Sequence, residues 1–469
     1  MGETQVFTDF ITGAKYGDLP QEVVKRAKTS ISDLIACGLG GRRTKEGDLL
    51  LDMMKYLGGK PAATVFGDRT KLPFMQAIQV NRVISNMLDY DDTHMRSGHM
   101  SSCLVPTALG IGERVKASGK AVINALVAGY EAVSRIRRAI DPTEEAFWKT
   151  FERVDSGLHF GVTAVAGKLL GLDNDQMASA FGLTGMVRIW RIAFPDRPKK
   201  GMPPWMKITG GDHTIPGIHS VLLAKRGFPG DKGLLDAGRG YHLTVGSDRY
   251  DATFLVKDLG SHYETMRIGY KFYSSCRHTS TTADAIAFLM EEHGISAEDV
   301  DQVVVKVQKI VADNFAIYEP TYMIQAQFSI PYVAAMVLLD EPTGPNWYTE
   351  EMLHDPRVRQ LHHRVKVVED PGAGHKFYSE HKSPSTVEIS TRDGKTFSRS
   401  VEYPRGEPEN PFSAVDHLDK LWKMASYAGI GKERIEKLIE KLDKLEKIKD
   451  IREVTRLLVP DNIGDRPAS

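Results

Sequence analysis

Hydrophobic residues in the first 268 positions of the chain recur mostly at helical spacing. One example follows Asp18-Leu19-Pro20, where Pro20 stands in the first turn of an expected helix whose apolar stripe runs to Gly38. The same spacing recurs in six further segments: residues 75–92, 104–117, 120–139, 157–170, 174–186 and 212–226. This part of the chain therefore predicts an all-helical bundle.

The pattern changes after residue 268. Residues 303–307 and 365–368 are runs rich in valine that predict strands, and residues 386–391 and 397–403 alternate in period two around Arg392-Asp393-Gly394-Lys395, which predicts a hairpin. Helical spacing returns between them at residues 279–293 and 327–339. The segment 411–458 is again amphipathic and helical, with one apolar stripe formed by Ile435, Leu438, Leu442 and Leu445.

These patterns predict a mainly α protein with two domains. A chain of 469 residues exceeds the ~250 to 300 residues at which a single hydrophobic core stops growing. We expect residues 1–268 to form the first part of a large helical domain and residues 269–408 to form a smaller α+β domain. Residues 409–469 then return to the helical domain, so that the α+β domain is an insertion.

Composition excludes several classes of function. The 61 basic and 61 acidic side chains give no formal net charge, so nothing favours a nucleic-acid or membrane partner. Three isolated cysteines do not fit a disulfide framework, a zinc ribbon or an iron–sulfur cluster. The chain has no long apolar run, no signal-peptide pattern and no phosphate-binding glycine motif. We therefore expect a cytoplasmic protein that uses neither metal nor cofactor.

The chemistry is concentrated in Asp89-Tyr90-Asp91-Asp92-Thr93-His94, which is followed by His99. The motif comes directly after an apolar helical run, so we expect Asp89 and Thr93, four residues apart, to share one helix face. Gly98 offers a break that would turn His99 back toward them. This pattern predicts a buried acid/base site, although a capped helix end facing water would use the same residue types.

Two later segments add candidate groups for an anionic ligand. His159 follows Gly157 at an expected helix start, where it is either structural or placed to support an anion. Residues 187–207 are rich in cations. Arg188 could clamp a carboxylate, and Lys207, between Trp205-Met206 and a glycine pair, could hold one as a desolvated ammonium.

The expected domain border contributes three more candidates. Lys271 and Cys276 lie in Lys271-Phe272-Tyr273-Ser274-Ser275-Cys276-Arg277-His278, at the kind of boundary where pockets form. The thiol of Cys276 would line that pocket or, beside Arg277, act as a nucleophile. Tyr332 opens a helix and would either reach the same cleft or be a buried structural phenol.

In combination, these motifs resemble the MmgE/PrpD family over nearly the whole chain. The likeness rests on ordered matches at Leu19-Pro20 with Asp33, residues 89–94 with His99, Gly157-Leu158-His159, residues 168–172, Lys207, residues 222–228, residues 327–332, and Tyr403-Pro404-Arg405-Gly406 with Asn410-Pro411. The resemblance implies a large helical domain interrupted by an α+β lid domain, and a homodimer. The chain departs from the family at Met100, at residues 189–204 and at Cys276, where some members carry histidine.

The resemblance also implies the roles of the candidate residues. It places Asp89, Thr93, His99, His159, Lys207, Lys271 and Tyr332 in the active site. We expect catalysis by His99, His159, Lys207, Asp89 and Thr93, and substrate binding by Lys271, Tyr332, Arg188 and Cys276. The lysines would stabilise negative charge on a carbon next to a carboxylate, and the histidines would move protons without metal.

We accordingly expect a cofactor-independent lyase that acts on a small hydroxy di- or tricarboxylate. A dehydratase resembling the 2-methylcitrate dehydratases is the first expectation. A decarboxylase resembling cis-aconitate decarboxylase and an epimerase resembling iminodisuccinate epimerase would use nearly the same residues. A protein that binds a metabolite without converting it is a further alternative of a different class.

Overall fold

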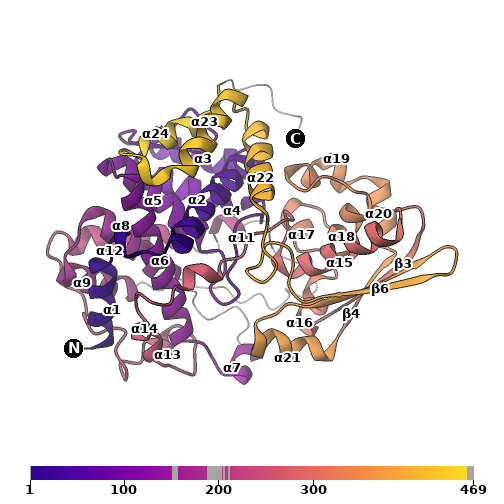
Figure 1. Ribbon diagram of the computed structural model, residues 1–469, viewed down its shortest axis with the longest axis horizontal. Helices are drawn as coiled ribbons and strands as arrows, with labels where there is room; N and C mark the ends of the chain where they lie inside the picture. The colour runs from indigo at the N-terminus through magenta and orange to yellow at the C-terminus, as the bar shows by residue number, and fades with distance from the viewer. Residues whose placement is uncertain (1, 150–156, 187–202, 204–205, 210–211, 462–469) are drawn as a thin grey trace.

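The computed structural model describes residues 2–149, 157–186, 203, 206–209 and 212–461. Its first part is helical, as expected from the sequence (Figure 1). It also contains a small antiparallel pair of strands, β1 and β2. The elements of this part are α1 (Glu3–Gly13), η1 (Tyr16–Asp18), α2 (Gln21–Gly41), α3 (Lys45–Leu57), β1 (Ala63–Thr64), β2 (Lys71–Leu72), α4 (Phe74–Met87), α5 (Ser101–Val115), α6 (Gly119–Ala139), α7 (Glu144–Lys149), α8 (Leu158–Leu170), α9 (Asn174–Gly185), α11 (Met206–Thr209), α12 (Thr214–Ala224), α13 (Tyr241–Thr244), α14 (Thr253–Val256) and η2 (Glu264–Arg267).

The long helices pack around one buried core. Helix α2 buries the stripe that begins at Val23 and continues through Ile31 and Leu34, so the apolar spacing in the sequence corresponds to the face in contact with other helices. Helices α6 and α8 approach closely because small residues face each other. A β-carbon at Gly161 would overlap the side chain of Val133.

The lid domain is built on a four-stranded sheet. Its elements are α15 (Arg277–His293), β3 (Val300–Val307), α16 (Lys309–Phe315), α17 (Met323–Gln327), α18 (Ile330–Leu338), η3 (Pro345–Tyr348), α19 (Glu350–Leu353), α20 (Pro356–His362), β4 (Val365–Glu369), α21 (Pro371–Glu380), β5 (Ser385–Thr391) and β6 (Thr396–Val401).

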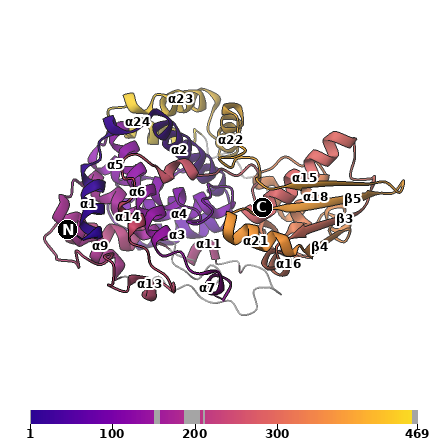
Figure 2. The same ribbon diagram turned by 60° about the horizontal axis from the view of Figure 1, so that its bottom comes forward.

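The strand order in this sheet is β4-β3-β5-β6. Strand β3 runs parallel to β4, with Val303 opposite Val365, and antiparallel to β5, with Val303 opposite Ile389. Strands β5 and β6 form the hairpin expected from the sequence. Val387 and Ile389 point to the buried face of the sheet, where α15 packs against β5 and β6 while α18 packs against β4 (Figures 1 and 2).

The chain then leaves the sheet and returns to the first helices. The last elements are α22 (Ala414–Tyr427), α23 (Lys432–Asp443), η4 (Leu445–Lys447), α24 (Arg452–Thr455) and η5 (Arg456–Leu458). Helix α22 packs along α2 (Figure 1). The short helix η4 contacts α6. The apolar stripe from Ile435 to Leu445 is buried there. This return confirms a mainly α fold with a small inserted α+β part. No helix among the described residues has both the length and the apolar character of a membrane span.

One expectation about local structure is wrong, and one helix begins later than expected. Asp89 and Thr93 do not share a helix face, because α4 ends at Met87 and Asp89 adopts a left-handed backbone conformation with φ of 49°. Aspartate tolerates the left-handed conformation better than most residues do, and a residue in this conformation ends a helix. The helix expected at 327–339 is confirmed as α18, but it begins three residues later than expected. The Ser329 hydroxyl accepts a hydrogen bond from Tyr332 N and caps its start, while Gln327 ends the preceding helix α17.

Candidate active site

The candidate site is built on the loop that follows α4. Since this helix stops at Met87, its last carbonyl groups need partners outside the helix. Side chains of the lid domain supply partners for the carbonyl of Met87 and for the next two: Gln327 Nε2 donates to the carbonyl of Met87 at 2.9 Å, Ser274 Oγ to that of Leu88 at 2.8 Å, and Lys271 Nζ to that of Asp89 at 2.7 Å. The loop is therefore fixed between the two domains.

Two lysines meet at the carboxylate of Asp89. The ammonium of Lys207, from the short helix α11, lies 2.6 Å from Asp89 Oδ1, and that of Lys271 lies 3.1 Å from the same oxygen. All three side chains are almost fully buried. Burial alone would raise the pKa of Asp89, but the charges of Lys207 and Lys271 hold it well below its usual range. Asp89 therefore stays ionised and keeps two cations in a fixed position.

The lysines are held by their surroundings as well as by Asp89. The backbone carbonyl of Lys207 accepts a hydrogen bond of 2.9 Å from Arg82, and the Lys207 ammonium lies 5.6 Å from the centre of the Phe328 ring. These contacts fix Lys207 between the helical part and the start of α18. A desolvated ammonium in this position is suited to a carboxylate ligand.

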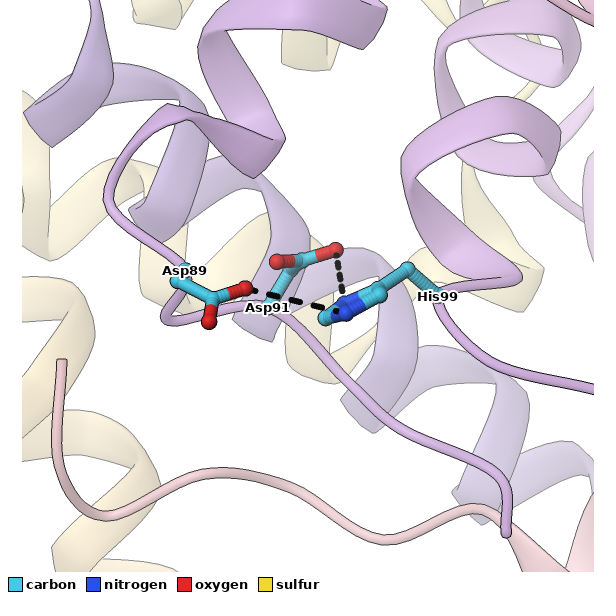
Figure 3. A group of neighbouring side chains, drawn as sticks. All are labelled: Asp89, Asp91 and His99. Carbon is cyan, nitrogen blue, oxygen red and sulfur yellow. Dashed lines mark hydrogen bonds and ion pairs between the residues drawn. The ribbon is translucent and has the colours of Figure 1, made fainter. Parts of the chain in front are cut away.

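His99 completes the group from the other end of the loop. Gly98, with φ of 70°, turns the chain so that His99 comes back to the first residues of the loop, as predicted. Its Nδ1 lies 3.1 Å from Asp91 Oδ2, and its Nε2 lies 3.6 Å from Asp89 Oδ1 (Figure 3). The other oxygen of Asp91 accepts a hydrogen bond of 2.8 Å from Asn86. Asp91 thus orients the imidazole and leaves Nε2 directed to the centre of the site.

The electrostatics of Asp91 suit this orienting role. Burial would raise its pKa, but the hydrogen bond and charge of His99, together with Lys271 and Lys207, lower the pKa below the usual value. An ionised Asp91 can only accept, so the proton of this hydrogen bond belongs to His99 Nδ1. The side chain of His99 is 32% exposed, whereas that of Asp91 is fully buried, so the imidazole lies on the open side of the site.

Asp89 Oδ2 and the hydroxyl of Thr93 are buried and have no hydrogen-bond partner among the described residues. The backbone of Thr93 pairs with Gly269 in a short bridge, which holds this hydroxyl on the same loop. Buried polar atoms without partners are costly unless a ligand or water binds them. Each of the two atoms is therefore a candidate contact for a polar group of a ligand.

The rest of the motif holds the loop in shape. Asp92 accepts a hydrogen bond from the amide of Ser101, and burial together with the charge of Asp91 raises its pKa well above the usual value. His94 Nδ1 accepts hydrogen bonds from the amides of Arg96 and Ser97, and burial lowers its pKa to about 3. His94 is therefore neutral. Asp92 and His94 thus bond to backbone amides of the loop, whereas Asp91 and His99 bond to each other beside Asp89.

The structure describes three of the other four predicted site residues. His159 lies in the first turn of α8, as expected, and its ring stacks on His213 with centroids 5.9 Å apart. The hydroxyl of Tyr332 donates to the carbonyl of Trp347, which is the structural alternative for this phenol. Cys276 directly precedes α15 and is 9% exposed. Arg188 lies outside the described residues. The roles of these four residues in catalysis or substrate binding stay predictions.

Three residues of the site had no predicted role. Asp91 was part of the motif, but an expected helix continuing to residue 92 would have turned it away from Asp89. Ser274 and Gln327 also stand in quoted motifs, and their side chains act on backbone carbonyl groups. A hydrogen bond from a side chain to a backbone carbonyl group has no characteristic residue spacing, so the sequence does not predict it. The sequence indicates only that the segments 271–276 and 327–332 flank the expected cleft.

Asp89, Asp91 and His99 also have the spacing of a metal site. Each offers a ligand atom, and these atoms lie within 4.8 Å of one another. However, the Asp89 oxygen nearest His99 already faces the ammonium groups of Lys207 and Lys271. A divalent ion bound to this oxygen would lie beside two positive charges. The charge arrangement therefore favours an acid/base site in which lysines neutralise the carboxylate.

Comparison with known proteins agrees with this picture. Residues 5–252 match the model of the MmgE/PrpD N-terminal domain, and residues 273–444 match that of the MmgE/PrpD C-terminal domain. The chain is 24% identical to a cis-aconitate decarboxylase of Mus musculus, over 98% of this chain and 94% of that protein. It is 26% identical to a cis-aconitate decarboxylase of Aspergillus terreus, over 87% and 86% of the two chains, and 25% identical to a 2-methylcitrate dehydratase of Salmonella typhi, over 79% and 80%.

Proposed function

The chain belongs to the MmgE/PrpD family, and from this premise we propose that it is a lyase that decarboxylates a small unsaturated tricarboxylate of the cis-aconitate type. The observation that carries the proposal is the meeting of two lysine ammonium groups and the His99–Asp91 pair around Asp89. The first expectation from the sequence was dehydration. The cis-aconitate decarboxylases cover more of the chain than the 2-methylcitrate dehydratases do, and this supports decarboxylation instead.

The geometry supplies what such a reaction requires. The bond between a carboxyl carbon and its neighbour breaks, carbon dioxide leaves, and the electron pair stays on the substrate, spread over the double bond and the adjoining carboxylate. Lys207 and Lys271 would stabilise this charge, because they are desolvated and already in place before the substrate binds. His99 Nε2 would then deliver one proton to carbon and be reprotonated from solvent, to which its ring is partly open.

Dehydration is the second candidate, and relatives that are 2-methylcitrate dehydratases support it. Loss of water needs a base to remove a proton from carbon and an acid to protonate the leaving hydroxyl. His99 would serve as one of these groups and His159 as the other. Decarboxylation requires one proton delivery only, and the His99–Asp91 pair suffices for it. The Thr93 hydroxyl and Asp89 Oδ2, which have no partner in the described part of the chain, would bind a polar group of the substrate in both reactions.

The test is NMR of the purified protein in deuterated buffer with cis-aconitate, citrate, 2-methylcitrate and substituted succinates. Decarboxylation predicts loss of one carboxyl group as carbon dioxide and one deuterium on carbon. Formation of an alkene from a hydroxy acid would support dehydration. Incorporation of deuterium at a carbon without loss of carbon dioxide or water would support epimerisation. Turnover should be lost in His99→Gln and retained in His354→Gln, which changes an exposed histidine. Tight binding of an acid without conversion would contradict a lyase.

A further inference from the structure

A third buried lysine approaches the site from the end of the chain. Lys420 lies on α22, the helix that returns from the lid domain to pack along α2. Its ammonium lies 2.7 Å from Asp33 Oδ1, on α2, and both side chains are buried. The charge of Asp33 raises the pKa of Lys420 above its usual value despite burial, so the ammonium stays protonated. Neither residue has a role in the reaction described above.

The ammonium of Lys420 has three hydrogen-bond donors, and each has an acceptor. Besides Asp33, it donates to the carbonyl of Tyr90 at 2.7 Å and to the carbonyl of Lys271 at 3.3 Å. It also lies 3.9 Å from the centre of the Tyr90 ring. A lysine can donate three such bonds and no more, so its hydrogen-bonding capacity is used completely. Two of the three bonds are to backbone of the candidate site.

The two carbonyl groups belong to the segments that carry the reacting groups. Tyr90 stands between Asp89 and Asp91, so its carbonyl orients the peptide that leads into Asp91. The carbonyl of Lys271 belongs to the residue whose ammonium reaches back to Asp89. One buried cation thus ties together the two chain segments whose relative position sets the distance between Lys271 and Asp89.

We propose that Lys420 is a positioning residue of this active site, which holds residues 89–91 and Lys271 in register through their backbone carbonyl groups. An ion pair needed only to join α22 to α2 would be satisfied by Asp33 alone. The two additional bonds connect Lys420 to the backbone of the site, whereas Asp33 acts on Asp91 and Lys271 through its charge alone. Loss of Lys420 should lower kcat, because small displacements of catalytic groups slow a reaction. A displacement of about 1 Å can lower the rate roughly 10²-fold.

The test separates positioning from stability with three variants. Lys420→Met removes all three bonds and leaves the buried Asp33 carboxyl group without its cation, so it lowers both the melting temperature and kcat. Lys420→Met with Asp33→Asn replaces that carboxyl group by an amide, and we expect the melting temperature to recover while kcat remains at least tenfold below that of the wild type. Asp33→Asn alone keeps an oxygen for Lys420 and both carbonyl contacts, so kcat should stay within about threefold. Lys423→Met, an exposed position on the same helix, is the matched control.

Two results would overturn the proposal. One is wild-type kcat in the folded double variant, which would leave Lys420 with a role in stability only. The other is a loss of kcat in Asp33→Asn as large as that in Lys420→Met, which would assign the effect to the ion pair, and this comparison stands even if the double variant fails to fold.

The kinetic comparison rests on the proposed function, so a crystal structure of Lys420→Met or of the double variant provides a second measurement. We expect the Lys271 ammonium to move away from Asp89 Oδ1 by about 1 Å or more. A wild-type protein that converts none of the acids would refute the proposed function, and the displacement would still test Lys420. Unchanged positions of Lys271 and of the Tyr90 carbonyl would refute the role of Lys420.

Discussion

The imidazole of His99 is held by Asp91 through a hydrogen bond of 3.1 Å between Nδ1 and Oδ2. The two residues stand eight positions apart on one loop, and the turn at Gly98 brings them together. The contact selects the imidazole tautomer and directs Nε2 toward Asp89 and its two lysines. This relationship leads directly to the first prediction.

Asp91→Asn should reduce kcat by about 10² or more, because an amide no longer fixes the tautomer or stabilises a protonated imidazole. His99→Gln should cost at least as much, and the double variant should be hardly worse than His99→Gln, since groups that act as a unit are not additive. Steady-state kinetics of the three proteins measure this. Fully additive losses would show that the two residues act independently.

Lys207→Ala should lower kcat/KM by about 10², or about 2.7 kcal/mol of transition-state stabilisation. The fold should persist, because Lys271 still neutralises Asp89 at 3.1 Å. Lys232→Ala, which removes an exposed lysine, should leave kcat/KM unchanged. Wild-type kinetics in Lys207→Ala would remove this residue from the active site, and an unfolded variant would give it a structural role instead.

His159→Gln tests the second histidine. If His159 exchanges a proton with the substrate, turnover should fall by about 10² or more while the far-UV circular dichroism and ligand binding persist. A small effect would fit a one-donor decarboxylation in which His99 acts alone. His213→Gln is a useful comparison, because it disturbs the stacked partner of His159 and retains the His159 ring itself.

The free energy of unfolding should decrease as the pH falls below about 6.5, and protonation of His94 in the unfolded chain should account for part of this decrease. Burial holds its pKa at about 3 in the folded state, against about 6.5 in the unfolded chain, so only the unfolded chain takes up a proton between these values. The stabilisation is complete above about pH 6.5 and is lost as the pH falls toward 3, by roughly 2 kcal/mol at pH 5.

His94→Asn isolates this contribution, because its side-chain oxygen can replace Nδ1 as the acceptor for the amides of Arg96 and Ser97. Urea unfolding at pH 7 and pH 5 should give the variant a smaller loss of stability than the wild type. Equal losses in the two proteins would show that His94 titrates alike in the folded and unfolded states.

Turnover should survive exhaustive treatment with a chelator. Asp89, Asp91 and His99 could offer ligand atoms to an ion, but Lys207 and Lys271 already neutralise the shared oxygen. Activity before and after EDTA, with calcium-saturated EDTA as the control, measures this. Loss of activity that a divalent ion restores would show that the three residues form a metal site after all.

The sequence predicted the elements of this fold well because apolar spacing decides them. The stripe of α2 and the alternation of β5 are regular patterns, and both are buried as expected. The loop after α4 was less predictable. Its apolar spacing continues past Met87, whereas the chain in fact leaves the helix and turns left-handed at Asp89.

The composition of the site could be predicted further than its geometry. Asp89, His99, Lys207 and Lys271 were all candidates before the structure was known, and they do meet. Which atoms of Asp89 the two ammonium groups contact depends on packing between segments more than 100 residues apart. That Asp91 holds the imidazole depends on the left-handed turns at Asp89 and Gly98 within one loop. Bonds to backbone carbonyl groups, such as that of Lys420, leave no pattern in the order of residues.

The contact between Lys420 and Tyr90 spans 330 residues of sequence, and this separation bears on synthesis. Early segments of a nascent chain can fold while later ones are still being translated. Every residue proposed to react has left the ribosome before α22 is made, but the last bonds that hold residues 89–91 and Lys271 together form only afterwards. A protein built in this way would acquire its activity late, when the returning helix docks on the domain that was synthesised first.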